Sequence, residues 1–149
     1  MGSTQIPFER LVRALEQLPG EQLLAQHGPV PPPAGAADSR AFMQFLEVIE
    51  CMARADVVVC HAGAGSILCA LRAGHTPVVV PRLKRYEETV DDHQVEFARA
   101  LGADGKVIAV EDLSLLAEAV AGAPRRREPE RRTGMLPIQS AVRDALHAR

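Results

Sequence analysis

The residues most able to do chemistry lie in one short stretch, His61–Ser66, which reads HAGAGS. Gly63 and Gly65 follow an apolar run, and a helix-forming stretch begins directly after them. Glycine allows a sharp turn and the close approach of a ligand. The free N–H groups at a helix start favour a phosphate there. The pattern predicts a phosphate-binding turn, with a plain tight turn capped by Ser66 as the alternative. It is neither a P-loop nor a complete G-x-G-x-x-G sequence.

Histidines and acids near this turn offer further chemistry. His61 follows the apolar run, and its labile proton suits it to orient a phosphate or to donate to a leaving group. A hydrogen bond to nearby backbone is an equally open interpretation. The tetrad 91–94, which reads DDHQ, opens a later helix. It serves either as ordinary capping or as a place where His93 and Gln94 reach a diphosphate or ribose.

Basic residues occur in two runs. Arg82, Lys84 and Arg85 come directly after Pro81, where they meet either an anionic substrate or only solvent. Residues 125–132 read RRREPERR, which is typical of an exposed linker, with contact to acidic lipid head groups as the alternative.

Composition limits the partners that the chain can have. The net charge of −2, the pI near 6.2 and the 3% of aromatic residues argue against a nucleic-acid partner. Five histidines and three cysteines lack metal-ligand or C-x-x-C spacing, so we expect no metal and no cofactor. The cysteine pattern indicates a reducing cytoplasm. No apolar run approaches the ~20 residues of a membrane span, so we expect any membrane link to be peripheral.

Strands and helices alternate along the chain and must position these residues. Apolar runs predict strands at residues 57–59, 77–81 and 107–110, with shorter ones at 21–26 and 41–45. Helical spacing and caps predict helices at residues 8–18, 46–54, 66–73, 92–101, 112–121 and 138–147.

This alternation predicts an α/β fold with a doubly wound parallel sheet. Ligands bind at the carboxyl ends of such strands. The loops at Gly2–Gln5, Cys60–Gly65 and Pro81–Asp92 should therefore converge on one crevice. We expect residues 1–122 to form the α/β domain and residues 123–149 to form a basic linker and a final helix.

Taken together, three segments resemble the C-terminal, donor-binding half of GT-B glycosyltransferases. They are His61–Ile67, the stretch Ala73–Arg82 with its Pro-bracketed valines, and Asp91–Ala98. The most similar kind is the small single-domain subunit of the family 28 C-terminal domain. PssE-type exopolysaccharide transferases and the catalytic subunit of the two-subunit UDP-N-acetylglucosamine transferase are of this kind. The opening Gly2–Val12 resembles the first loop and helix of that family.

The resemblance implies a Rossmann-like domain that uses a UDP-sugar donor and no metal. It implies transfer to a polyprenyl-diphosphate-linked acceptor in exopolysaccharide synthesis. The enzyme would act at the cytoplasmic membrane face with a membrane-associated, acceptor-binding partner subunit. By the same resemblance, His61 and Thr4 border the reacting centre. The donor would contact nine residues, namely Gly63, Ala64, Gly65, Ser66, Pro81, Arg82, Asp92, His93 and Gln94.

Two departures from the family pattern bear on this interpretation. Related transferases often carry a ribose-binding acid three residues beyond Ser66, where this chain has Cys69. The family also begins with an apolar strand before its first loop, whereas Met1 stands directly before Gly2. We therefore expect a sheet that lacks its first strand. The alternatives are a non-catalytic, nucleotide-sugar-binding regulatory subunit and an unrelated α/β domain for a phosphorylated metabolite.

Overall fold

The computed structural model describes residues 6–18 and 22–126. Several predictions fall outside these residues. They concern the loop Gly2–Gln5 with Thr4, most of the basic run 125–132, and the helix at 138–147. None of the helices in the described ranges is long and apolar enough to cross a membrane.

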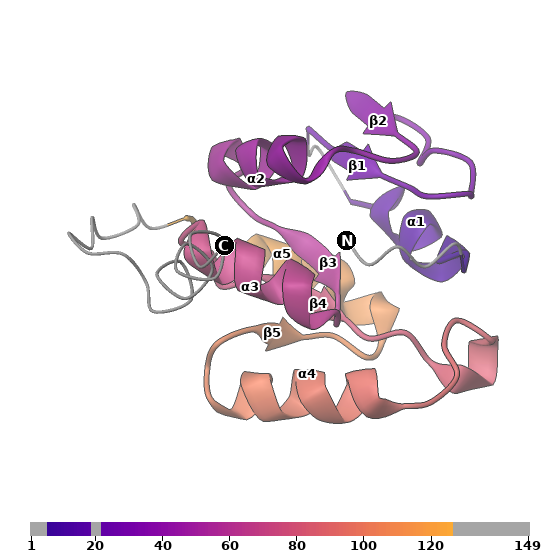
Figure 1. The fold of residues 1–149 in the computed structure, drawn as a ribbon, viewed down its shortest axis with the longest axis vertical. Coiled ribbons are helices and arrows are strands. Elements are labelled where there is room, and N and C mark those ends of the chain that lie inside the picture. The colour runs from indigo at the N-terminus through magenta and orange to yellow at the C-terminus, as the bar shows by residue number, and fades with distance from the viewer. Residues whose placement is uncertain (1–5, 19–21, 127–149) are drawn as a thin grey trace, which may run out of the picture.

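A three-stranded parallel sheet forms the centre of the fold (Figure 1). Its strands are β3 (Val59–His61), β4 (Val78–Val80) and β5 (Ile108–Ala109), in the order β3-β4-β5. His61 is paired with Val80 at the carboxyl ends of β3 and β4. β4 is fully buried, as its run of three β-branched residues between prolines predicts for a central parallel strand.

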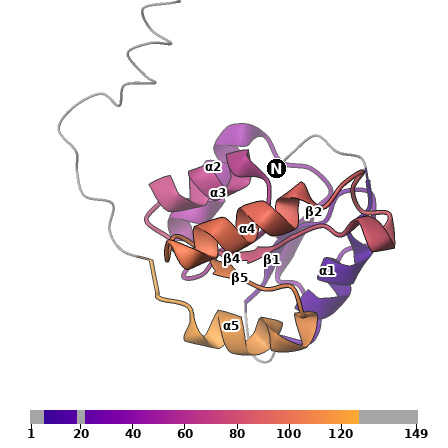
Figure 2. The same cartoon turned by 90° about the horizontal axis from the view of Figure 1, so that it is seen from below.

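Helices cover both faces of this sheet, and the alternation of side chains along β4 assigns them to their faces. Val78 and Val80 pack with α1 (Glu9–Leu15) and α5 (Leu116–Gly122). Val79 faces α3 (Ala64–Arg72) and α4 (His93–Ala103). Figure 2 shows β4 and β5 between α4 and α5. The predicted α/β fold with a parallel sheet is confirmed, and it is Rossmann-like.

A second, two-stranded parallel sheet lies beside the first. It consists of β1 (Leu24–Gln26) and β2 (Asp38–Arg40), and α2 (Phe45–Arg54) follows it. Within the described residues, β1 and β2 share no ladder with β3, β4 or β5. An apolar cluster connects the two-stranded sheet and α2 to the three-stranded sheet. In it, Val48 and Met52 of α2 pack with Ala70 of α3 and with Val58, which precedes β3.

Apart from shifts of two or three residues at the ends of α1, β3 and α3, three predictions about element boundaries are wrong. The strand expected at 41–45 lies instead at Asp38–Arg40, because Phe45 begins α2. The carboxylate of Glu47 accepts the Gln44 N–H at 2.9 Å, which stabilises that helix start. Gly102 does not end its helix, because α4 continues to Ala103. A Cβ added to Gly102 would lie 3.5 Å from the Cβ of Ala109, so α4 packs against β5 at this position.

The third wrong boundary concerns the helix after Asp112. The chain first forms a 3-10 turn, η2 (Leu113–Leu115), before α5 begins. The predicted cap is confirmed all the same, because the Asp112 carboxylate accepts the Ser114 N–H at 3.0 Å.

Candidate functional site

The turn between β3 and α3 is the centre of the candidate site. Gly63 is the residue before the helix and has an extended backbone. No side chain among the described residues caps the first turn of α3, which Ala64, Gly65 and Ser66 form. The N–H groups of a first helical turn have no partner within the helix. They are therefore available to a ligand, and the positive end of the helix dipole favours an anion there.

Ser66 supplies a second polar group at this helix start. Its side chain lies in the first turn and is buried, with 3% exposed. Its hydroxyl oxygen has no hydrogen-bond partner in the described part of the chain. The interpretation of Ser66 as the helix cap is wrong, because Gly63 occupies that position. A buried hydroxyl without a partner costs about 1–3 kcal/mol, and a ligand bound at this helix start would offer it an acceptor.

The two glycines have different surroundings. A Cβ added to Gly63 would collide with the imidazole of His61, whose Cε1 would lie 2.9 Å away. Gly63 is thus needed because His61 packs against its backbone. A Cβ added to Gly65 would have no atom within 4 Å, so it would project into open space. Gly65 itself lies in the first turn of α3, the turn at which the pattern predicted a phosphate.

His61 ends β3 as a nearly buried neutral base. Only 9% of the residue is exposed. Burial, with a smaller effect of the positive charge on Arg82, lowers the pKa of His61 to about 4. The imidazole is therefore uncharged at neutral pH. It can orient a ligand through a hydrogen bond, whereas donating a proton to a leaving group would require its scarce protonated form. Its catalytic role stays a prediction.

Arg82 lies near His61, because the loop after β4 leaves the same edge of the sheet. Its NH1 group donates to the carbonyl oxygens of Pro7, at 3.0 Å, and Glu88, at 3.3 Å. Its guanidinium stacks 4.5 Å from the centre of the Phe8 ring. The buried Nε has no partner within the described residues. Partial burial lowers the pKa of Arg82 from its usual value.

The remaining predicted donor residues are placed around the same loop. The side-chain oxygen of Gln94 accepts the Arg82 N–H at 3.2 Å, and the Asp92 carboxylate accepts the Lys84 N–H at 3.0 Å. Pro81 is buried. The His93 side chain is 82% exposed and lies near acidic neighbours. The structure thus brings Arg82 and Gln94 together, while His93 extends into solvent. The role of each in donor binding stays a prediction.

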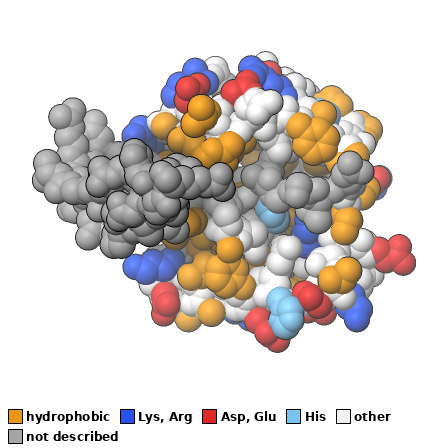
Figure 3. Space-filling view, viewed as in Figure 1, with side chains coloured by type: hydrophobic (Ala, Val, Ile, Leu, Met, Phe, Trp, Pro, Cys, Tyr) orange, Lys and Arg blue, Asp and Glu red, His pale blue; other side chains and the backbone are white. Residues whose placement is uncertain are grey.

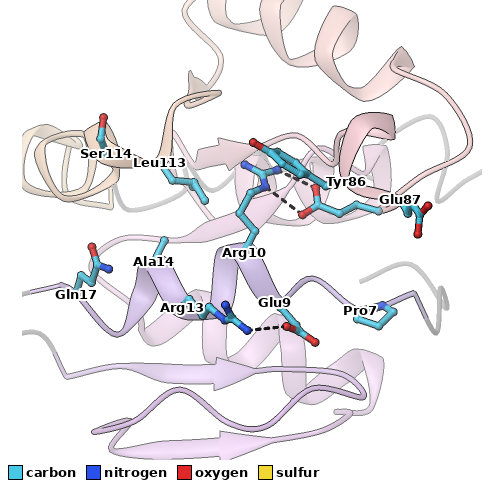
Figure 4. A pocket seen from close by; sticks show the side chains of 11 residues that line it. Pro7, Glu9, Arg10, Arg13, Ala14, Gln17, Tyr86, Glu87, Leu113 and Ser114 are labelled. Carbon is cyan, nitrogen blue, oxygen red and sulfur yellow. Dashed lines mark hydrogen bonds and ion pairs between the residues drawn. The ribbon is translucent and has the colours of Figure 1, made fainter.

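Sequence reasoning missed an ion pair beneath this loop. Glu88 is buried and accepts two hydrogen bonds from Arg10 of α1, at 2.9 and 3.0 Å. Both glutamates fall in the predicted loop Pro81–Asp92, and nothing in the sequence pattern separates Glu88 from the exposed Glu87. An open groove of about 810 Å³ lies beside this pair, between α1, η2 and the 3-10 turn η1 (Lys84–Tyr86) (Figure 4). None of its lining residues belongs to the glycine turn.

The cysteines lie in apolar surroundings. Burial raises the pKa of the Cys60 thiol to about 12, which makes it an unreactive core residue. Cys69 is half-buried against the cluster between α2 and α3. In the described residues, no group of three or more His, Cys, Asp or Glu side chains could hold a metal ion. On the face in Figure 3, Lys and Arg side chains are dispersed among acidic and apolar ones.

Fold and site together define a Rossmann-like α/β domain, with a glycine turn, a helix start and the Arg82 loop at the carboxyl edge of its sheet. Sequence comparison identifies the family. The chain belongs to the glycosyltransferase family 28 C-terminal domain, whose profile matches residues 2–144. The resemblance drawn from the three sequence segments is therefore confirmed. No solved structure matches the chain.

Several curated proteins match parts of the chain. The UDP-N-acetylglucosamine transferase subunit ALG13 of Yarrowia lipolytica is 50% identical over 50 residues, which cover 34% of this chain and 24% of that protein. The ALG13 subunit of Cryptococcus neoformans is 47% identical over 76 residues, covering 48% and 36%. A UDP-N-acetylglucosamine–N-acetylmuramyl-(pentapeptide) pyrophosphoryl-undecaprenol N-acetylglucosamine transferase of Cupriavidus necator is 35% identical over 92 residues, covering 59% and 25%. The matches thus span between 24% and 36% of these relatives.

The contrast between the glycines yields a prediction about stability. Gly63→Ala should lower the free energy of unfolding by about 1–3 kcal/mol, because its Cβ overlaps the buried imidazole. Gly65→Ala, within the helix and facing open space, should raise it by up to about 1 kcal/mol. Urea unfolding of both variants measures this difference, and equal losses in the two variants would contradict the assigned surroundings.

The low pKa of His61 predicts a pH dependence of stability. Between the unfolded value of 6.5 and the folded value of about 4, the unfolded chain binds more protons than the folded one. The free energy of unfolding should therefore fall as the pH drops through this window, by about 2 kcal/mol between pH 7 and pH 5. The glutamine in His61→Gln does not titrate. Between pH 7 and pH 5 the free energy of unfolding of this variant should therefore fall by about 2 kcal/mol less than that of the wild type. Identical pH profiles for the two proteins, measured by urea unfolding, would refute the assignment.

Proposed function

We propose that this chain is the donor-binding part of a glycosyltransferase that uses a UDP-sugar. The observation that carries the proposal is the buried Ser66 hydroxyl without a partner, in a helix start that no described side chain caps. Family membership supports it independently. Diphosphate oxygens are acceptors that suit both the hydroxyl and the first-turn N–H groups.

In this proposal two kinds of group stabilise the diphosphate: the N–H and hydroxyl dipoles at the start of α3, and the partly buried guanidinium of Arg82. Gly63, Ala64, Gly65 and Ser66 form the cradle for the diphosphate at the start of α3. Arg82, whose Nε is unpaired, supplies positive charge from the neighbouring loop. As the sugar leaves, negative charge develops on the diphosphate, and donors already aimed at it lower the barrier. This arrangement assigns no role to a metal ion. Gln94 holds the backbone of Arg82 in place.

The names of the relatives point to a first donor and acceptor to test. All three relatives are N-acetylglucosamine transferases by name, so UDP-N-acetylglucosamine is the proposed donor. One name includes a pyrophosphoryl-undecaprenol acceptor, which supports a polyprenyl-diphosphate-linked sugar as the acceptor here. Two are called subunits. We infer from this a membrane-associated partner that supplies the acceptor side, with transfer at the cytoplasmic face in exopolysaccharide synthesis.

A second candidate function is a regulatory subunit that binds nucleotide-sugars without catalysis. The observation that favours it is Cys69, which packs toward the apolar cluster of α2 and α3 where related transferases carry a ribose-binding acid. The neutral state of His61 also makes this residue a poor proton donor for the leaving group. In this second proposal the glycine turn holds the same ligand, but the chemistry belongs to another chain.

Donor binding is tested with the glycine pair. UDP and UDP-N-acetylglucosamine should bind the wild-type chain and raise its melting temperature. Gly65→Ala should weaken that binding while keeping or raising stability, because in the proposed cradle its added Cβ would stand in the first turn of α3, next to the diphosphate. Ser66→Ala should weaken UDP binding about tenfold, as expected for one lost hydrogen bond to a charged group.

Isothermal titration calorimetry with UDP, UMP and N-acetylglucosamine 1-phosphate measures these affinities. Family membership already argues against an unrelated α/β domain, and a preference for simple sugar phosphates over UDP would contradict a nucleotide-diphosphate donor. An absence of UDP binding by the wild type would overturn the proposal.

Cys69 separates the two candidate functions. For a catalytic subunit whose ribose contact lies elsewhere, Cys69→Glu should leave UDP affinity largely unchanged, because no ribose contact depends on position 69. Cys69→Ser is the matched control for removing the thiol. A gain of tenfold or more in Cys69→Glu alone would indicate a degraded ribose site and favour the regulatory subunit. Calorimetric affinity for UDP, rather than transfer activity, is the measurement.

A further inference from the structure

Among the described residues, Glu88 is the one carboxylate in the buried class, with 5% of the residue exposed. Its neighbour Glu87 is exposed and has a left-handed backbone, with φ of 58°. This turn directs the Glu88 side chain under the loop between β4 and α4. Burying a carboxylate is costly unless hydrogen bonds and an opposite charge compensate.

Every contact of the Glu88 carboxylate joins it to one of two segments. Its Oε1 accepts from Nε of Arg10 at 3.0 Å, and its Oε2 accepts from NH2 of Arg10 at 2.9 Å. The same Oε2 accepts the Leu83 N–H at 3.0 Å. Arg10 NH2 also donates to the Pro81 carbonyl at 2.9 Å. The pair thus fastens the first residues of the loop to α1.

The residues held by this pair flank Arg82, the basic residue of the candidate site. Arg82 lies between Pro81 and Leu83, the two residues held by the pair. Its own NH1 donates to the Glu88 carbonyl, and its N–H donates to Gln94 at the start of α4. The position of Arg82 beside His61 therefore depends on a chain of contacts that begins at the Arg10–Glu88 pair.

We propose that Glu88 is a positioning residue for donor binding, which acts through Arg10 and the Leu83 N–H to hold Arg82 at the glycine turn. The inference rests on the proposed function, since it concerns the affinity of that same site for UDP. A buried ion pair is weak evidence of stabilisation, because well-packed apolar residues often replace it without loss. What they cannot replace is the bidentate geometry that sets the place of the loop.

This distinction defines the test. Glu88→Gln leaves Arg10 as an uncompensated charge and should weaken both folding and UDP binding. The double variant Arg10→Met with Glu88→Leu removes both charges, so it should recover stability. It should nevertheless bind UDP at least about tenfold more weakly than wild type, because Arg82 is no longer held. A merely structural pair would recover affinity together with stability.

The chain offers a matched control in Arg99–Glu111. This pair has the same two-pronged geometry, at 2.6 and 2.8 Å, but its side chains are 65% and 38% exposed. It joins α4 to Glu111, two residues beyond the end of β5, and among the described residues no hydrogen bond links the pair to the site loops. Arg99→Met with Glu111→Leu should leave UDP affinity within about twofold of wild type, as expected for an exposed ion pair.

Calorimetry with UDP gives the affinities, and amide hydrogen exchange of residues 82–90 reports the loop itself. We expect faster exchange of the Leu83 N–H in the Arg10/Glu88 double variant than in the Arg99/Glu111 double variant. Unchanged UDP affinity in the Arg10/Glu88 variant would overturn this inference and leave the proposed function intact. A wild-type chain that does not bind UDP would overturn both, and the exchange data would then report only on the fold.

Discussion

The complete burial of β4 is the constraint on which this structure depends. Val78, Val79 and Val80 expose none of their surface, and each face of the strand requires its own cover. α1 and α5 supply one cover, and α3 and α4 supply the other. Helices on both faces require crossover connections, which make the strands parallel. Parallel strands end at one edge, so the glycine turn after β3 and the loop after β4 become neighbours.

The candidate site at that edge is built from dipoles more than from fixed charges. The helix start offers N–H groups, Ser66 offers a hydroxyl, and His61 is neutral because it is buried. The one cation in the wall is Arg82, and it is partly engaged by backbone carbonyls and the Phe8 ring. Such a set of groups favours an anion whose charge is spread over several oxygens.

The family match and the geometry of the site are two separate lines of support for the proposed donor site. The family profile covers most of the chain, whereas the matches to individual relatives are short. The glycine turn agrees with the proposed donor site. Cys69 departs from the family pattern, and the structure explains why a thiol is tolerated there, since it packs against the apolar cluster of α2 and α3. A difference in ribose recognition is therefore compatible with an intact fold.

The sequence by itself determined the elements whose patterns are local. Valine runs predicted β3 and β4, the glycine spacing predicted the turn, and apolar spacing predicted α2. Only the tertiary structure decided which polar groups are buried. Glu88 and Glu87 are identical in sequence terms, yet only Glu88 meets Arg10, which lies 78 residues earlier in the chain. Likewise, the unpaired state of Ser66 depends on what surrounds the first turn of α3. Local patterns encode the conformation of an element, whereas the environment of one side chain depends on partners that only folding brings close.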